Sequence, residues 1–172
     1  MKRTLTLVMA LMFLFTAASV KAQDTYKSAV GLRVGDGYYD LVSASLKTFL
    51  GSSPGALELN VGFRDYGYFG YDWFNLSASL SYQYHFDIKP VPGLRWFVGA
   101  GVTAFNTFSS DAYYRGFGLG IFPTGGVDYK FSKIPLDVSA DIRPTIGIIK
   151  PYSYYDDFYV GNFGLAARYT FR

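Results

Sequence analysis

The sequence predicts an all-β fold, namely an eight-stranded antiparallel up-and-down transmembrane β-barrel that is preceded by a cleaved signal peptide. Three observations support this fold. The first 22 of the 172 residues have the pattern of an export signal. Residues 23–172 alternate between apolar and small or polar side chains in two-residue steps, which is the period of a β-strand. Charged residues make up 17% of the chain, against about 25% in soluble domains, so the surface is poor in ions.

The N-terminal segment predicts export rather than a membrane anchor. Lys2 and Arg3 precede an apolar run over residues 5–15, and Val20 and Ala22 suit the positions three and one before a cleavage point. The apolar run is shorter than the roughly 20 residues that a membrane-spanning helix requires. We therefore expect residues 1–22 to be a signal peptide and residues 23–172 to be the barrel domain.

Removal of the signal peptide changes the charge of the chain. It takes away three basic residues and no acid, which leaves 13 basic and 13 acidic residues and a net charge of zero. No electrostatic argument for a nucleic-acid partner remains. The chain has no cysteine, so a closed strand ladder rather than disulfides would hold an exported domain together. One histidine and no cysteine also provide no metal-ligand cluster, and we expect no metal and no cofactor.

Eight segments alternate strongly enough to be strands, and turn residues separate them. The most regular one sets Leu57, Leu59 and Val61 against Glu58 and Asn60. The predicted strands cover residues 26–35, 39–50, 56–65, 73–87, 94–105, 116–131, 136–147 and 163–172. Two of them contain a proline, Pro123 and Pro144, and a bulge or strand end is expected at each because proline removes a ladder donor.

Periodicity alone does not decide whether the apolar face meets lipid or a protein core. Many predicted strands are near the 9–11 residues that a tilted membrane strand requires. The opposite face consists mainly of small residues, as a narrow lumen requires, and the chain has a single glutamate. The connections at residues 51–55, 89–93 and 132–135 are short, whereas most of the others are longer and rich in tyrosine and glycine. Short periplasmic turns and longer outer loops are typical of outer-membrane barrels, with both termini in the periplasm.

Aromatic residues gather at the strand ends, as in the two girdles of a membrane barrel. The predicted girdle at the turn end comprises Tyr26, Phe86, Trp96, Tyr129, Phe131, Tyr169 and Phe171. The predicted girdle at the loop end comprises Tyr66, Tyr68, Trp73, Phe74, Phe117 and Tyr159.

A signal peptide, eight alternating strands and a last strand that ends in Tyr169, Thr170 and Phe171 resemble the small outer-membrane β-barrels of the OmpA/OmpX kind. The resemblance covers essentially all of residues 23–172 and is one of pattern. It implies a monomer in the lipid of a Gram-negative outer membrane. It also implies that Tyr169 and Phe171 form the signal that the barrel-assembly machinery reads. The chain departs from the family in that Arg172 follows the final aromatic residue.

Strand parity directs most strand charges into the lumen. Each short turn is flanked by an inward pair of opposite charges, which can lie directly across the hairpin from each other. The three pairs are Lys47 with Glu58, Asp87 with Arg95, and Lys130 with Asp137. With Lys27, Asp128 and Arg168 nearby, we predict a salt-bridge network that plugs the base of the lumen. The alternative is that each pair is separately hydrated and contributes little.

Three further arginines, Arg33, Arg64 and Arg143, point inward near the outer mouth with no strand acid expected at their level. One interpretation is an anion site, for example for a lipopolysaccharide phosphate. The favoured interpretation is pairing with acids of the loops, namely Asp36, Asp65, Asp156 and Asp157.

Some eight-stranded barrels are lipid-modifying enzymes, and the candidate residue here is His85. Lipid A deacylases of the family carry a His-x-Ser pair on the lipid-facing side, whereas His85 precedes Phe86 and Asp87 and points inward. A structural histidine is therefore favoured, and no enzyme is expected.

The predicted role is structural or surface interaction. The tyrosine-rich loops at residues 66–71, 113–114 and 152–155 would meet an extracellular partner or lipid headgroups. A narrow pore for small solutes or a lipid-binding barrel is the alternative, and a lipid-modifying enzyme ranks third.

Overall fold

The computed structural model describes residues 26–171 except 52, 69–70, 90 and 154, so the predicted signal peptide and Arg172 lie outside the described residues. The strands are β1 (Ser28–Gly35), β2 (Val42–Phe49), β3 (Gly55–Tyr68), β4 (Tyr71–Asp87), β5 (Leu94–Ser109), β6 (Gly116–Lys130), β7 (Leu136–Ile142), β8 (Thr145–Ile149), β9 (Phe158–Tyr159) and β10 (Phe163–Phe171), with one 3-10 turn, η1 (Ala112–Tyr114). Within the described part of the chain, no helix is long and apolar enough to span a membrane.

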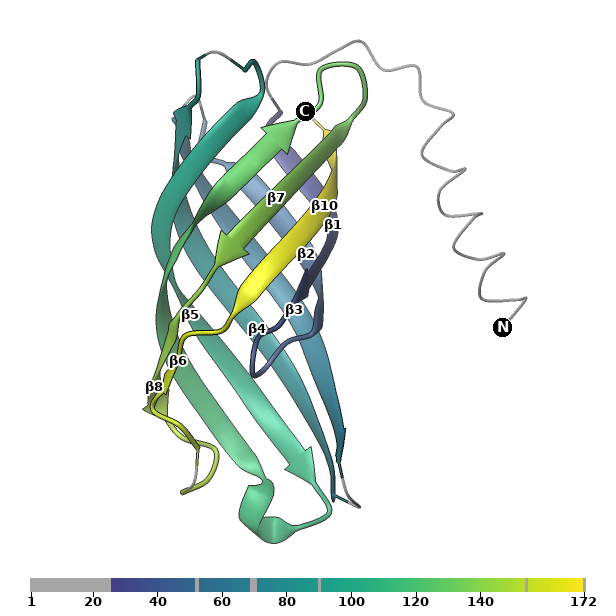
Figure 1. The fold of residues 1–172 in the computed structure, drawn as a ribbon, viewed down its shortest axis with the longest axis vertical. Helices are drawn as coiled ribbons and strands as arrows, with labels where there is room; N and C mark the ends of the chain where they lie inside the picture. Colours follow the sequence, from purple (N-terminus) through teal and green to yellow (C-terminus); the bar gives the residue numbers. More distant parts are fainter. Residues whose placement is uncertain (1–25, 52, 69–70, 90, 154, 172) are drawn as a thin grey trace, which may run out of the picture.

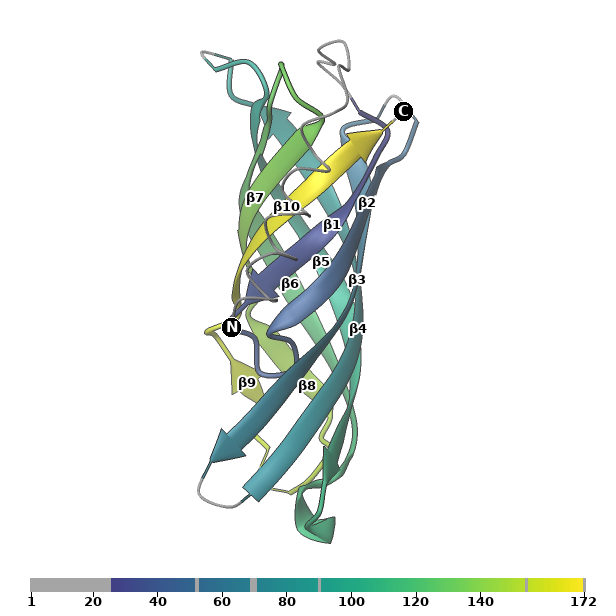
Figure 2. The ribbon, with the colours of Figure 1, turned by 90° about the vertical axis from the view of Figure 1, so that its right-hand side faces the viewer.

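The strands close into an antiparallel barrel (Figure 1). The sheet order β5-β4-β3-β2-β1-β10-β7-β6-β8-β9 is completed by pairing of β5 with β6. The ten strands correspond to a barrel wall of eight, as the sequence predicted. β7 and β8 are successive parts of one predicted strand, and β9 has only two residues and is not counted as a strand of the wall. The short turns and the C-terminus lie at one end, and η1 and β8–β9 lie at the other (Figures 1 and 2). These ends are called the base and the mouth.

The alternation along the strands separates an apolar outer face from a polar lumen, as predicted. In β10, Phe163, Leu165 and Phe171 are 58%, 68% and 40% exposed, whereas the inward residues that alternate with the outer face are buried, namely Gly164, Ala166, Arg168 and Thr170. Tyr26 departs from the predicted girdle, whereas the side chains of Tyr66 and Tyr68 lie outside the described part of the structure. Tyr26 is buried inside the base against Phe49, with 5.2 Å between the ring centroids, whereas Lys27 is exposed. The parity of β1 does not extend to these residues because the strand begins only at Ser28.

Pro123 and Pro144 lie at the same break in the wall. The β6–β7 ladder ends at Gly125↔Ile142, and the β6–β8 ladder resumes in the same register at Ile121↔Ile146. That register places the two prolines opposite each other, where neither offers a backbone N–H to the ladder. The predicted strand end occurs at Pro144. At Pro123, however, β6 continues without interruption in its pairing with β5.

The seam that closes the barrel joins β1 to β10, with Ser28 opposite Phe171 and Gly35 opposite Gly164. Gly31 lies at a close approach within this seam. A Cβ atom there would lie 2.0 Å from the carbonyl oxygen of Ala167 and 2.6 Å from the Cα atom of Arg168. These are backbone atoms, so the clash could be relieved only by moving one strand away from the other.

We therefore expect Gly31→Ala to lower the free energy of unfolding by about 2 kcal/mol, because the added methyl group overpacks the seam. Urea unfolding in lipid vesicles, followed by tryptophan fluorescence, measures this change. The matched control is Gly125→Ala, since the nearest atom to a Cβ there, the carbonyl oxygen of Phe97, is 3.7 Å away. Equal stability of the two variants would contradict the packing argument.

Candidate functional site

The candidate functional site is the lumen, where salt bridges join five cations and five acids. Buried charges are costly unless each is paired and hydrogen-bonded, so the balance of signs is itself a structural requirement. The cations are Arg33, Lys47, Arg95, Arg143 and Arg168, and the acids are Asp40, Glu58, Asp128, Asp137 and Asp141.

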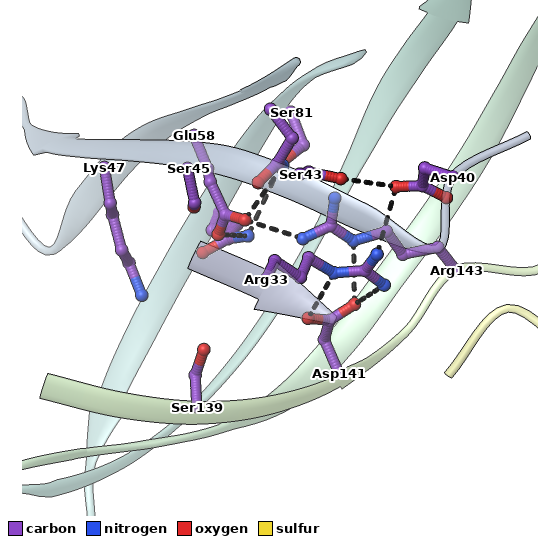
Figure 3. A network of polar contacts seen from close by, with 12 residues as sticks. Arg33, Asp40, Ser43, Ser45, Lys47, Glu58, Ser81, Ser139, Asp141 and Arg143 are labelled. Atoms are coloured by element: carbon purple, nitrogen blue, oxygen red, sulfur yellow. Dashed lines mark hydrogen bonds and ion pairs between the residues drawn. The ribbon is translucent and has the colours of Figure 1, made fainter. Parts of the chain in front are cut away.

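Glu58 is the centre of this network. Its Oε1 atom lies 2.7 Å from Nη2 of Arg143 and 2.9 Å from Nη2 of Arg168. Asn60 donates to the same oxygen at 3.0 Å, and Gln83 donates to Oε2 at 2.8 Å. Glu58 is 1% exposed. One carboxylate on β3 therefore binds arginines from β10 and from the segment between β7 and β8. Figure 3 shows Glu58 beside Arg143.

Towards the base, Asp128 is the second centre. Its carboxylate lies 2.8 Å from Nζ of Lys47, 3.2 Å from Nε of Arg95 and 3.4 Å from Nε2 of His85. Arg168 also reaches Asp137 at 3.4 Å and donates to Ser45 and Ser139, each at 2.8 Å. The basal charges thus join strands that are far apart around the barrel.

The predicted hairpin partners do lie directly opposite in register, with Lys47↔Glu58, Asp87↔Arg95 and Lys130↔Asp137. The ion pairs, however, do not form within these three hairpins. Lys47 of β2 reaches Asp128 of β6 across the lumen. Arg95 pairs with Asp128, and Arg168 with Asp137, between register partners on neighbouring strands. Inward side chains converge on the axis of a narrow barrel, so the opposite wall is within reach of a long side chain.

Two residues of the predicted network take other positions. Asp87, at the end of β4, is exposed to solvent and forms no salt bridge with the described residues. Lys130 is buried and donates to the carbonyl oxygens of Phe131 at 2.5 Å and Ile134 at 2.9 Å. Strand parity correctly predicted that Lys130 points into the lumen. It failed for Asp87, because the side chain of a residue at a strand end can turn towards solvent.

The outer arginines do have a strand acid at their level, which the sequence interpretation missed. Asp141 of β7 lies 2.8 Å from Nη2 of Arg33 and 2.7 Å from Nε of Arg143. Asp40, from the connection between β1 and β2, lies 3.2 Å from Arg33. Asp141 continues the inward alternation of Asp137 and Ser139, so parity along β7 would have revealed it.

Arg64 is the predicted mouth arginine that does pair with a loop acid. Its guanidinium lies 3.3 Å from Asp36 and also donates to the carbonyl oxygen of Gly37. Of the other acids proposed for this role, Asp157 pairs with Lys150 at 2.5 Å, and Asp65 and Asp156 are exposed.

An inward-folded connection lies at the mouth. Residues 36–41 join β1 to β2 and turn into the lumen, so Tyr39 and Asp40, which were assigned to the second strand, are buried in this connection. Tyr39 stacks on Phe105 at 5.4 Å and bonds to Thr145 and Asn162. Burial, and then the neighbouring Asp40 carboxylate, raise the pKa of Tyr39, so its hydroxyl keeps its proton.

Loop tyrosines pack on this connection at the mouth. Tyr155 is buried against Tyr38 and Phe105, at 4.6 and 5.5 Å between ring centroids. The hydroxyls of Tyr38 and Tyr152 lie 2.7 Å apart, and Tyr152 contacts Tyr114 at 5.6 Å. Part of the tyrosine-rich loop surface therefore covers the lumen.

An aromatic layer covers the base. The guanidinium of Arg95 lies over the rings of Phe49 and Tyr26, at 4.8 and 5.6 Å. His85 packs between Phe49 and Phe97, and its Nδ1 atom is 3.3 Å from the carbonyl oxygen of Pro54. His85 thus contacts Asp128 and a backbone carbonyl rather than the lumen serines. Within the described residues, no group of three His, Cys, Asp or Glu side chains is placed to hold a metal ion.

Removal of the Asp128 charge leaves the buried Lys47 and the partly buried Arg95 beside a neutral amide. We expect Asp128→Asn to lower the free energy of unfolding by about 3 kcal/mol, because a broken buried pair leaves an uncompensated charge. Urea unfolding in vesicles measures it. The control Asp87→Asn concerns an exposed acid and should change stability by less than about 0.5 kcal/mol. Similar values for both variants would show that the basal network contributes little.

No family model matches the chain, and no curated protein sequence matches it. A similar solved structure is the crystal structure of Neisserial surface protein A, with a TM-score of 0.57 and 16% identity. The match covers 87% of this chain and 99% of that chain. At this identity the likeness concerns the fold alone. The chain therefore has the fold of a small eight-stranded antiparallel barrel, similar to that of a bacterial surface protein.

Proposed function

We propose that this protein is an integral outer-membrane β-barrel with a sealed lumen and a structural or surface-interaction role. The observation that carries the proposal is that three layers of packed side chains fill the lumen. An aromatic layer at the base, the charge network in the middle and the tyrosine-rich cluster at the mouth follow one another along the barrel axis.

The outer face supports membrane insertion. Large apolar side chains that are 40–60% exposed occur on β1 to β6 and on β10, for example Leu32, Phe63, Val98 and Phe117. Soluble monomers rarely expose contiguous apolar patches above a few hundred Å². A closed ladder also satisfies the backbone in lipid, where water is absent. The likeness to a bacterial surface protein supports the outer membrane as the location.

The packing of the lumen favours a sealed barrel over the alternative of a small-solute pore. Passage through the centre would require separation of Glu58 from Arg143 and Arg168, which are all at most 1% exposed. Breaking a buried ion pair costs about 3–5 kcal/mol. The buried arginines Arg33 and Arg143 are already paired with acids, which argues equally against an anion site in the lumen.

Catalysis forms no part of the proposal. A hydrolase requires a nucleophile within hydrogen-bond distance of a base. His85 instead lies within the basal aromatic layer beside Asp128.

We expect the purified barrel to give no stable single-channel currents in planar bilayers. The double variant Glu58→Gln, Arg168→Gln removes one charge of each sign from the centre of the lumen. It should produce intermittent current events, because uncharged amides no longer hold the walls together. A porin reconstituted by the same procedure controls for insertion. Stable current steps from the unmodified protein would refute the sealed lumen and favour the pore.

The proposal includes recognition of the last strand by the barrel-assembly machinery. Tyr169 and Phe171 lie on the outer face of β10 at the base, and Phe171 is 40% exposed. We expect Phe171→Ala to reduce the heat-modifiable barrel recovered from the outer membrane of a Gram-negative host about threefold, because the aromatic contact with the machinery is lost. Phe163→Ala, on the same face at the other end of β10, should leave the yield unchanged. Equal yields from both variants would argue against a terminal signal.

The surface-interaction role would fall to η1 rather than to the loop at residues 152–155. Tyr113 of η1 is 82% exposed, whereas Tyr155 is buried in the mouth. An extracellular partner would therefore meet Tyr113 and the neighbouring end of β5.

A further inference from the structure

The outer wall carries an apolar groove that the sealed-lumen role does not use. It has a volume of about 570 Å³ and crosses β1, β10, β7 and β6 to the start of β5. Its two sides are rows of outward side chains that the strand register aligns. One row is Leu32, Ala167, Val138, Tyr129 and Leu94, and the other is Val34, Leu165, Ala140 and Val127.

The depth of the groove follows from the residues between and within these rows. Asp128, Ser139 and Ala166 lie between the rows but point into the lumen, so the floor there is backbone. Ala140 and Ala167 are the small members of the rows, whereas Leu165 beside them is 68% exposed and forms a ridge. A second hollow of about 330 Å³ lies on the other side of the Val34–Leu165–Ala140 row and shares these three residues with the first.

The dimensions suit one hydrocarbon chain. The groove crosses five adjacent strands, and four interstrand spacings of about 4.8 Å give a length of about 19 Å. The rows are two residues apart along each strand, about 6.8 Å, which admits a slender chain but not a strand or helix. One leaflet of the hydrocarbon core is about 15 Å thick, so an extended acyl chain can occupy most of this length.

The ends of the groove identify the leaflet. Leu94 and Tyr129 are at its base end, on β5 and β6, and the other end reaches Val34 near the mouth end of β1. The turns that flank the base end of the β5–β6 pair carry two exposed cations, Lys89 and Lys133. They would face the phosphate of a lipid whose chain enters from the base.

A second copy of the chain fits this wall less well. Two barrels present convex surfaces that touch along a line, whereas a stable interface between proteins buries about 1,200–2,000 Å². A flexible chain can follow the curvature of the wall across all five strands. The acyl chain is surrounded by lipid whether or not it is bound, so the hydrophobic effect does not favour binding. Close packing against the groove would hold the acyl chain instead.

We propose that the groove over β1, β10, β7, β6 and β5 binds an acyl chain of a glycerophospholipid from the leaflet at the base of the barrel. The phosphate of this lipid lies near Lys89 and Lys133. The inference rests on the proposed insertion into a membrane. It adds a defined lipid site to a wall that would otherwise contact lipid without preference.

Photolabelling tests the site. The full barrel is reconstituted in phosphatidylcholine vesicles that contain, as a minor component, phosphatidylglycerol with a diazirine in one acyl chain. We expect label on peptides of β6, β7 and β10 in several-fold excess over peptides of β3 and β4. Ala140→Phe fills the groove at its small residue and should lower that labelling about threefold. The control Ala78→Phe adds the same side chain to an outward position on β4 and should not change it.

Each outcome bears on one of the two proposals. Equal labelling of all strands, or groove labelling that Ala140→Phe does not reduce, would overturn the lipid site while leaving membrane insertion intact. Protection of the groove together with cross-linked dimers would assign it to a second copy and would also overturn the proposal. A lack of label anywhere on the outer face would instead refute membrane insertion. Loss of the strand preference in a Lys89→Gln, Lys133→Gln variant would support the assignment of the phosphate, and an unchanged preference would overturn that part.

Discussion

Pairing of buried charges around Glu58 is the constraint on which the rest of the structure depends. An ionised carboxylate that is 1% exposed is stable only if cations and hydrogen-bond donors surround it. Here the cations come from distant parts of the chain, Arg143 and Arg168, and reach β3 only when the barrel is closed. Closure of the ladder and neutralisation of the lumen are therefore one event.

The same constraint connects the fold to the proposed role. The network is electrically balanced, with Asp141 between Arg33 and Arg143 and Asp128 between Lys47 and Arg95. The five cations and five acids that the salt bridges join cancel in charge, which fits the proposed sealed lumen. Aromatic side chains lie at both ends of the network, Phe49 and Phe97 at the base and Tyr39 and Phe105 at the mouth, which also fits the proposed sealed lumen.

The wall of the barrel is not uniform around its circumference. The long strands β3 to β6 have 14–17 residues, whereas β1 and β2 have 8 each. The ladder is interrupted where Pro123 and Pro144 face each other, and small residues open a groove between β1 and β6. Lipid contact therefore differs from one side of the barrel to the other.

The sequence by itself determined the number of strands in the barrel wall, the side of each strand that faces the lumen and the register of the short hairpins. These features are local, because a two-residue period and a short turn specify them without reference to distant strands. Lys47 opposite Glu58 is an example. At strand ends, where Tyr26 turns inward and Asp87 reaches solvent, this local rule no longer applies.

Only the tertiary structure decided which charges pair and which residues pack together at the mouth. Glu58 and Arg143 are 85 residues apart, and Tyr39 and Asn162 are 123 apart. Strand parity places a side chain inside the lumen, but it does not say which of several inward partners lies across the axis. The tilt and closure of the sheet set those distances, and closure is a property of all the strands together.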